Sequence, residues 1–145
     1  MPATADQRAA TTDAIVATLR AAWPDVQAVY LFGSWGTEDE WPTSDVDVAV
    51  LLPPDRAKAL GTMELIQVQM RLSSLLHKPV DLLNLRRVST VFQKEVVMAD
   101  RRIYTAAEYA AEEFEMLTLS FYQKLNEERA EILAEGRRSG RFYNV

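Results

Sequence analysis

Two short apolar segments, joined by a loop that starts and ends with distinctive residues, constrain the fold of this chain most. Residues 26–32 lead into Gly33-Ser34, and ten residues later Asp45-Val46-Asp47 opens the second segment, 45–52. Both segments have the length and the Val, Leu and aromatic content of β-strands. The sequence therefore predicts a strand, a small-residue turn, a loop and then a strand that begins on two carboxylates.

The two carboxylates point to a phosphate-handling site. Asp45 and Asp47 are two residues apart on the expected strand, so their side chains share one face. Two neighbouring carboxylates repel each other unless a cation lies between them. Mg²⁺ is commonly bound by one or two carboxylates together with the phosphates of a substrate. Gly33 lets a backbone approach a phosphate closely, and Ser34 adds a hydroxyl donor.

A third carboxylate, Asp81, lies inside the apolar run 79–85, which is the next expected strand. A charged residue in a strand expected to be buried needs a reason, and a neighbouring metal supplies one. In the expected mechanism, Asp45 and Asp47 hold one or two Mg²⁺ ions that bridge the phosphates of a nucleotide. Asp81 contacts the second ion and helps to deprotonate an acceptor hydroxyl, which attacks the α-phosphorus in line and releases pyrophosphate.

The remaining periodicity predicts one domain over 1–145 in which helices alternate with strands. Asp55 is the expected N-cap of the second helix, and Gly136 the expected stop of the last. The fold class is α/β (α+β), with a small mixed sheet flanked by helices, a long C-terminal helix and a mobile tail over 136–145. The expected helices cover 5–22, 55–76, 89–98 and 106–135, and the further strands cover 79–85 and, at a sheet edge, 101–104.

Composition excludes several classes of function. The net charge of −5 disfavours direct binding to nucleic acid, which needs a basic face. The absence of cysteine excludes disulfides and thiolate metal sites. No apolar run approaches the ~20 residues of a membrane span, and the N-terminal residues lack the apolar segment of a signal peptide. The expected location is therefore the cytoplasm.

The spacing of Gly33-Ser34 and Asp45-Val46-Asp47 resembles the signature of the DNA polymerase β-like nucleotidyltransferase superfamily. The short chain and Val80-Asp81-Leu82 resemble its minimal nucleotidyltransferase (MNT) branch. The run 125–129, with basic and aromatic residues after it, is similar to the tail of MNT antitoxins that pair with HEPN-domain toxins. The resemblance implies a nucleotidyltransferase fold and a hetero-oligomer with such a toxin.

The same resemblance implies an activity and assigns its residues. It implies an ATP- and Mg²⁺-dependent enzyme that moves AMP from ATP onto a tyrosine hydroxyl of the partner RNase toxin and so neutralises it. By this resemblance, Gly33 and Ser34 bind the nucleotide phosphates. Asp45, Asp47 and Asp81 are the metal-binding and catalytic residues.

The loop over 35–44 departs from the superfamily pattern and leaves two other functions open. Many relatives carry an arginine soon after Gly-Ser, whereas this loop has no basic residue and three consecutive acids at 38–40. Such acids weaken nucleotide binding unless they face solvent, which motivates a binding-only antitoxin as an alternative. A small-molecule nucleotidyltransferase of the aminoglycoside type is the other, disfavoured because little chain remains after Asp81. Trp35 and Trp41 either stack on a ligand or pack within the protein, and His77 is expected at the surface.

Overall fold

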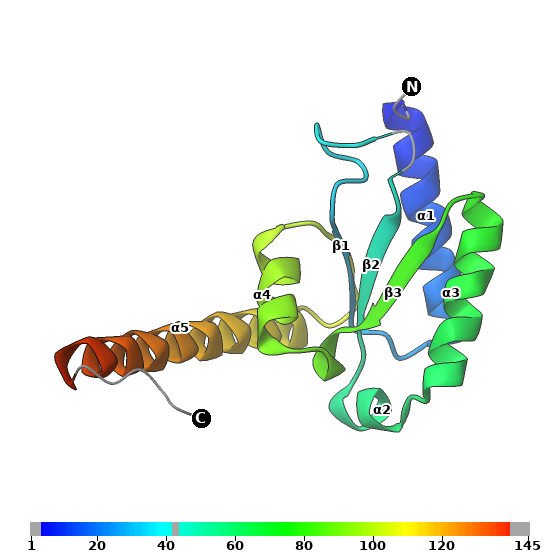
Figure 1. Ribbon diagram of the computed structural model, residues 1–145. Helices are drawn as coiled ribbons and strands as arrows, with labels where there is room; N and C mark the ends of the chain where they lie inside the picture. The colour runs from blue at the N-terminus through cyan, green and yellow to red at the C-terminus, as the bar shows by residue number, and fades with distance from the viewer. Residues whose placement is uncertain (1–3, 42–43, 140–145) are drawn as a thin grey trace.

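The computed structural model describes residues 4–41 and 44–139, and within them a sheet packed between helices (Figure 1). The observed elements follow the predicted alternation of helices and strands. In chain order they are α1 (Ala5–Ala22), β1 (Ala28–Phe32), β2 (Val46–Leu51), α2 (Pro54–Ala59), α3 (Thr62–Leu76), β3 (Val80–Asn84), the 3₁₀ turn η1 (Leu85–Arg87), α4 (Thr90–Met98), β4 (Arg102–Thr105) and α5 (Glu108–Ser139).

The four strands form one mixed sheet in the order β3-β2-β1-β4. β1 runs antiparallel to both of its neighbours, β2 and β4, whereas β2 and β3 are parallel. The parallel pair needs a crossover connection, which α2 and α3 provide. The predicted mixed sheet and the predicted edge position of the 101–104 segment are both confirmed.

Alternation along the strands divides the core between the two faces of the sheet. Val46, Val48 and Val50 join the cluster that packs against α1 and α3. Ala49 and Leu51 join the opposite cluster, which packs against α4 and the beginning of α5 (Figure 1). Asp47 lies on the same side of β2 as Ala49, so its carboxylate is on the face that α4 and α5 cover.

The predicted continuous helix over 55–76 is wrong, because the chain breaks it into α2 and α3. Leu60 takes an extended conformation, with φ −67° and ψ 118°, and Gly61 then caps the start of α3. Glycine lowers the stability of a helix interior, whereas it is acceptable at an N-cap. The predicted N-cap Asp55 is also wrong, since Pro53 holds that position and Asp55 lies in the first turn. The N-cap predicted at Ser89 is confirmed by a bond from Phe92 N–H to its hydroxyl.

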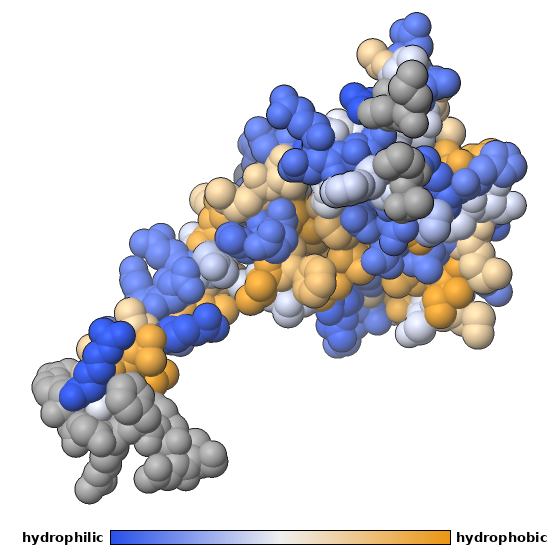
Figure 2. All heavy atoms as spheres, turned by 45° about the horizontal axis from the view of Figure 1, so that its top comes forward, coloured by the Kyte–Doolittle hydropathy of each residue, from blue (hydrophilic) through white to orange (hydrophobic). Residues whose placement is uncertain are grey.

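Helix α5 packs against the sheet near its beginning and then extends away from it (Figure 1). Phe114 and Thr118 are buried, whereas Phe121 is 58% exposed. Hydrophobic side chains remain visible along this extension (Figure 2). The predicted end at Gly136 is wrong, because the helix continues through this glycine to Ser139. Of the tail predicted to be mobile, 136–139 is helical and 140–145 lies outside the described residues. Within the described part of the chain, no helix is both long and apolar enough to cross a membrane.

Candidate functional site

The Gly33-Ser34 turn closes the end of β1 in a conformation that requires glycine. Gly33 has φ +73°, a region that side-chain-bearing residues rarely adopt. The Ser34 carbonyl accepts hydrogen bonds from both the backbone N–H and the hydroxyl of Thr37, at 3.0 and 2.6 Å. The turn is therefore fixed by its own backbone and by the first residues of the following loop.

The loop after the turn returns to its starting point through two serines. The Ser34 and Ser44 hydroxyls lie 3.2 Å apart, and Ser44 Oγ also accepts a 2.6 Å bond from Trp41 N–H. Ser44 directly precedes Asp45, so this contact places the Gly33-Ser34 turn beside the start of β2. The ten-residue spacing in the sequence is thus the length of a loop that closes on itself.

Pairing across the sheet brings Asp47 next to the other predicted site residues. Asp47 is paired with Phe32 of β1 on one side and with Asp81 of β3 on the other. A Cβ added at Gly33 would lie 2.0 Å from Asp47 Oδ2, so only glycine leaves room for this carboxylate. The sequence alone does not reveal this steric role of Gly33, because the role depends on the pairing of β1 with β2.

The electrostatics of Asp47 show that three carboxylates act on one another here. Burial, followed by the charges of Asp81 and Asp45, raises the pKa of Asp47 from 3.8 to about 6, while Arg101 partly opposes that rise. Asp45 and Asp81 are themselves exposed. The expectation that Asp81 is buried in its strand is therefore wrong, because its side chain is exposed to solvent.

The three carboxylates suit a cation that carries much of its own coordination shell. Among residues 4–41 and 44–139, no group of three or more acidic or histidine side chains forms a ready-made cation site. Mg²⁺ usually takes only one or two carboxylates and completes its shell with water and phosphates. The hard oxygen donors of Asp45, Asp47 and Asp81 match that mode of binding, because burial together with the charges of Asp81 and Asp45 raises the pKa of Asp47 when no cation is bound.

Arg101 lies at the candidate site, although no sequence pattern predicted it there. Its guanidinium donates from Nη1 to the Gly33 carbonyl at 3.2 Å and from Nη2 to the Trp35 carbonyl. Its own carbonyl accepts a 2.9 Å bond from Leu31 N–H, which joins it to the end of β1. No local pattern in the sequence signals this contact, because Arg101 reaches the turn only through the pairing of β1 with the chain entering β4.

The acidic loop repels an anion less strongly than its composition indicates. Glu38 and Asp39 are exposed to solvent. Glu40 turns inward, accepts a 2.7 Å bond from Gly36 N–H and lies 3.7 Å from Arg8. Two of the three charges are thus directed to water, and the third has a hydrogen-bond donor and a cation beside it.

The two tryptophans of the loop and the histidine have separate environments. Trp35 is 3% exposed and belongs to the core cluster on the α1 and α3 side. Trp41 is 71% exposed. His77 is exposed at the end of α3, in a left-handed conformation with φ +54°, which confirms its expected surface position.

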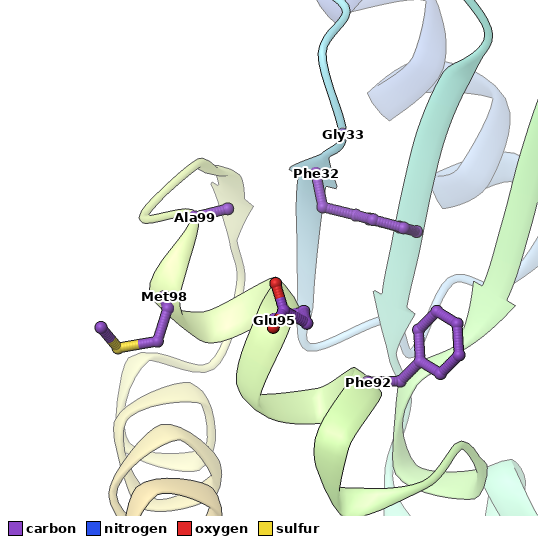
Figure 3. Close-up of a pocket in the computed structure, with 6 residues that line it drawn as sticks. All are labelled: Phe32, Gly33, Phe92, Glu95, Met98 and Ala99. Carbon is purple, nitrogen blue, oxygen red and sulfur yellow. The ribbon is translucent and has the colours of Figure 1, made fainter.

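A hollow of about 430 Å³ opens beside the turn, between the end of β1 and helix α4 (Figure 3). In Figure 3 the Phe32 side chain reaches toward β2, the strand that carries Asp47, and Phe92 projects from α4. An apolar hollow next to the Gly33-Ser34 turn offers room for a planar ring. The residues that line it are Phe32, Gly33, Phe92, Glu95, Met98 and Ala99.

A small-residue turn placed against a carboxylate pair at the end of a mixed sheet defines a class of phosphate-transferring proteins. Residues 14–109 match the family model described as polymerase beta, nucleotidyltransferase. The chain therefore belongs to this nucleotidyltransferase family, and the predicted nucleotidyltransferase fold is confirmed. Most of α5 lies beyond the matched residues.

Individual relatives are also similar to this chain. The protein adenylyltransferase MntA of Shewanella oneidensis is 36% identical over 119 residues, which are 82% of this chain and 82% of the relative. A chain in the crystal structure of a toxin–antitoxin with AMP-PNP is 32% identical, with a TM-score of 0.74 over 86% of this chain and 96% of that chain. A chain in the structure of tri-AMPylated Shewanella oneidensis HEPN toxin with MNT antitoxin is also 32% identical, with a TM-score of 0.70 over 86% of this chain and 94% of that chain.

Proposed function

We propose that this chain is an antitoxin that transfers AMP from ATP to a tyrosine hydroxyl of a cognate HEPN-domain toxin and thereby neutralises it. The observation that carries the proposal is the approach of the Asp47 carboxylate to Gly33, in a chain 36% identical to a protein adenylyltransferase. This contact puts a carboxylate beside a glycine turn, which supports a metal ion held next to the phosphates of a nucleotide. The similarity to chains from toxin–antitoxin complexes supports a protein as the acceptor.

The proposal gives each residue of the candidate site a role that its position supports. Gly33 and Ser34 would bind the triphosphate, and Asp45, Asp47 and Asp81 would hold Mg²⁺. A bound Mg²⁺ would neutralise charge on the phosphates as pyrophosphate departs. The bond that forms joins the acceptor oxygen to the α-phosphorus, and the bond that breaks joins this phosphorus to the bridging oxygen of pyrophosphate. The exposed carboxylate of Asp81 helps to take the proton of the attacking hydroxyl.

The wider setting is part of the same proposal. Residues 1–145 act as one minimal nucleotidyltransferase domain in a hetero-oligomer with the toxin, in the cytoplasm. Helix α5 supports the involvement of a partner protein, since much of its length extends from the domain with exposed side chains such as Phe121 and Ile132. The same helix favours the alternative of a binding-only antitoxin, because neutralisation by contact alone needs a surface of this kind and no chemistry.

Transfer of label separates chemistry from binding. The full chain, the product of the neighbouring gene, Mg²⁺ and ATP labelled in its α-phosphate are incubated together, and label on the toxin is counted. We expect the wild type to label the toxin and Asp47→Asn to lose at least about a hundredfold in rate, since one of the carboxylates proposed to hold the metal ion beside the phosphates is gone. The matched control is Asp13→Asn, on the exposed side of α1, which leaves the rate unchanged.

Two other outcomes would assign a different function. A tight complex without label, equally tight in Asp47→Asn, shows that the protein neutralises by binding alone. Label on a small hydroxylated compound rather than on the toxin shows a small-molecule nucleotidyltransferase.

A further inference from the structure

Arg101 is delivered to the Gly-Ser turn by the way helix α4 ends. The N–H of Asp100 bonds to the Val97 carbonyl, and Asp100 takes a left-handed conformation with φ +54°. This conformation is uncommon for a residue with a side chain, although Asp tolerates it better than most. The chain then reverses, and the Arg101 backbone pairs with Leu31 at the end of β1. The side chain of Arg101 is thus held at the turn by its own backbone.

The guanidinium of Arg101 donates hydrogen bonds to the turn at two points. Its two bonds reach the carbonyls of Gly33 and Trp35, on either side of Ser34. A guanidinium has five N–H donors in a rigid fork. Two are used on these carbonyls, so the group fixes the turn and keeps further donors for an anionic ligand.

The second glycine of the loop is shaped to this guanidinium. Gly36 has φ +79°, and a Cβ added there would lie 2.7 Å from Arg101 Nη2. Gly33 and Gly36 therefore each leave room for a charged side chain, Asp47 in one case and Arg101 in the other. The loop conformation and the position of the guanidinium depend on each other.

The charges around Arg101 leave it available to an anion. Burial and the neighbouring charge of Arg8 lower the pKa of Arg101, while Asp47 opposes that fall. Arg8 already faces Glu40, at 3.7 Å. An added anion would relieve both the repulsion between the two arginines and the desolvation of Arg101, whereas a second cation would worsen them.

We propose that Arg101 positions the triphosphate of ATP: it holds the Gly33–Trp35 turn in its binding conformation and supplies the positive charge that the loop over 35–44 lacks. This inference rests on the proposed nucleotide-dependent function and adds a specific residue to it. Arg101 acts on nucleotide binding and on the geometry of the turn, so its loss raises Kd and KM for ATP more than it lowers kcat.

The test measures ATP binding to the full chain by calorimetry in the presence of Mg²⁺, together with KM and kcat for transfer to the toxin. Loss of a charge-assisted contact in Arg101→Met is expected to raise Kd about 10- to 100-fold. Arg101→Lys keeps the charge but not the two-carbonyl grip, so its Kd should lie between those of the wild type and Arg101→Met. The charge-matched control is Arg87→Met, at an exposed position in η1, with Kd unchanged.

A double-mutant cycle with Gly36→Ala tests whether the turn works through the guanidinium. The added methyl group displaces Arg101, so Gly36→Ala should raise Kd in the wild-type background and have much less effect in the Arg101→Met background. If Arg101→Met does not fold, as judged by its thermal transition, Arg101→Lys and Gly36→Ala carry the test. Equal Kd values for the wild type, Arg101→Lys and Gly36→Ala would overturn the proposal.

Failure of this inference is distinguishable from failure of the proposed function. Transfer of AMP by the wild type, with KM for ATP unchanged in Arg101→Met, overturns the role of Arg101 and leaves the function standing. Binding of ATP that depends on Arg101, without transfer to the toxin, supports the role of Arg101 and overturns the transferase. A wild type that does not bind ATP overturns both.

Discussion

The carboxylate of Asp47 lies against Gly33 so closely that a Cβ on Gly33 would come within 2.0 Å of the Asp47 Oδ2 oxygen. The two residues are 14 positions apart in the sequence, and the pairing of Phe32 with Asp47 across β1 and β2 brings them together. The glycine that shapes the turn is therefore also the glycine that admits the carboxylate.

Gly33→Ala should disable the site by two physical effects. The new methyl group would strain the backbone at φ +73° and displace the Asp47 carboxylate. We expect at least about a hundredfold loss of AMP transfer, together with about 1 to 3 kcal/mol of destabilisation. Gly61→Ala is the control, since a Cβ at Gly61 meets nothing within 4 Å. Transfer and urea unfolding are the measurements, and a Gly33→Ala protein as active as Gly61→Ala contradicts the account.

Asp47→Asn should stabilise the metal-free protein in a pH-dependent way. The folded state raises the pKa of Asp47 from 3.8 to about 6, so it binds more protons than the unfolded state between these values. Stability of the wild type therefore falls as pH rises through this window, and the penalty is complete above pH 6. With solvent screening of this half-exposed group, we expect Asp47→Asn to raise Tm by about 2 to 4 °C at pH 7.5.

The gain from Asp47→Asn should shrink below pH 6 and be absent near pH 4, where the carboxyl is neutral in both states. Thermal unfolding in EDTA across this pH range measures it. A gain in Tm that is the same at pH 4 and pH 7.5 would show that carboxylate repulsion is not its cause.

Tyr30 ties the sheet to α5 through Glu115. Its hydroxyl donates to Glu115 Oε2 at 2.8 Å, and Arg102 Nη1 donates to the same oxygen at 2.7 Å. Burial, reinforced by Glu115, raises the pKa of Tyr30, so the hydroxyl stays protonated and remains a donor. Tyr30→Phe should cost about 1 kcal/mol of folding free energy. Tyr109→Phe, at a position 79% exposed, should cost less than about 0.5 kcal/mol in the same denaturation experiment.

Two phenylalanines about two helical turns apart show how far α5 packs against the rest of the domain. Phe114 is 8% exposed and packs on the sheet, whereas Phe121 is 58% exposed. Phe114→Ala should destabilise the protein by about 3 kcal/mol, and Phe121→Ala by less than about 1 kcal/mol. Equal losses for the two variants in denaturant unfolding would show that the extension of α5 packs on the domain.

The predicted elements and the observed ones agree where local patterns decide the outcome. Alternating valines and the Gly-Ser punctuation are enough to predict β1 and β2, and a capping serine is enough to predict the start of α4. The break at Leu60-Gly61 escaped because the apolar period continues across it, with Leu65 and Val68 following in step. Gly136 misled in the opposite direction, since a glycine inside a helix costs only about 1 kcal/mol and the flanking residues favour the helix.

The residues of the candidate site also differ in whether a local sequence pattern predicts them. Gly33, Ser34, Asp45 and Asp47 could be predicted as site residues because one short stretch of sequence carries them all. Arg101 was not found, because its contact with the turn depends on a left-handed residue at the end of α4 and on the pairing of the following chain with β1. The contact of Glu40 with Arg8 could not be predicted either, because it joins residues far apart in the sequence. It reduces the electrostatic repulsion between the acidic loop and an anion such as ATP.

Intact-mass spectrometry of the cognate toxin tests the proposed transfer most directly. The toxin is incubated with ATP and Mg²⁺ together with the wild-type chain or with Asp47→Asn, and its mass is measured after separation. We expect a toxin heavier by one or more whole AMP units with the wild type and an unmodified toxin with Asp47→Asn. A toxin that the wild type neutralises without any gain in mass would contradict the proposed transfer.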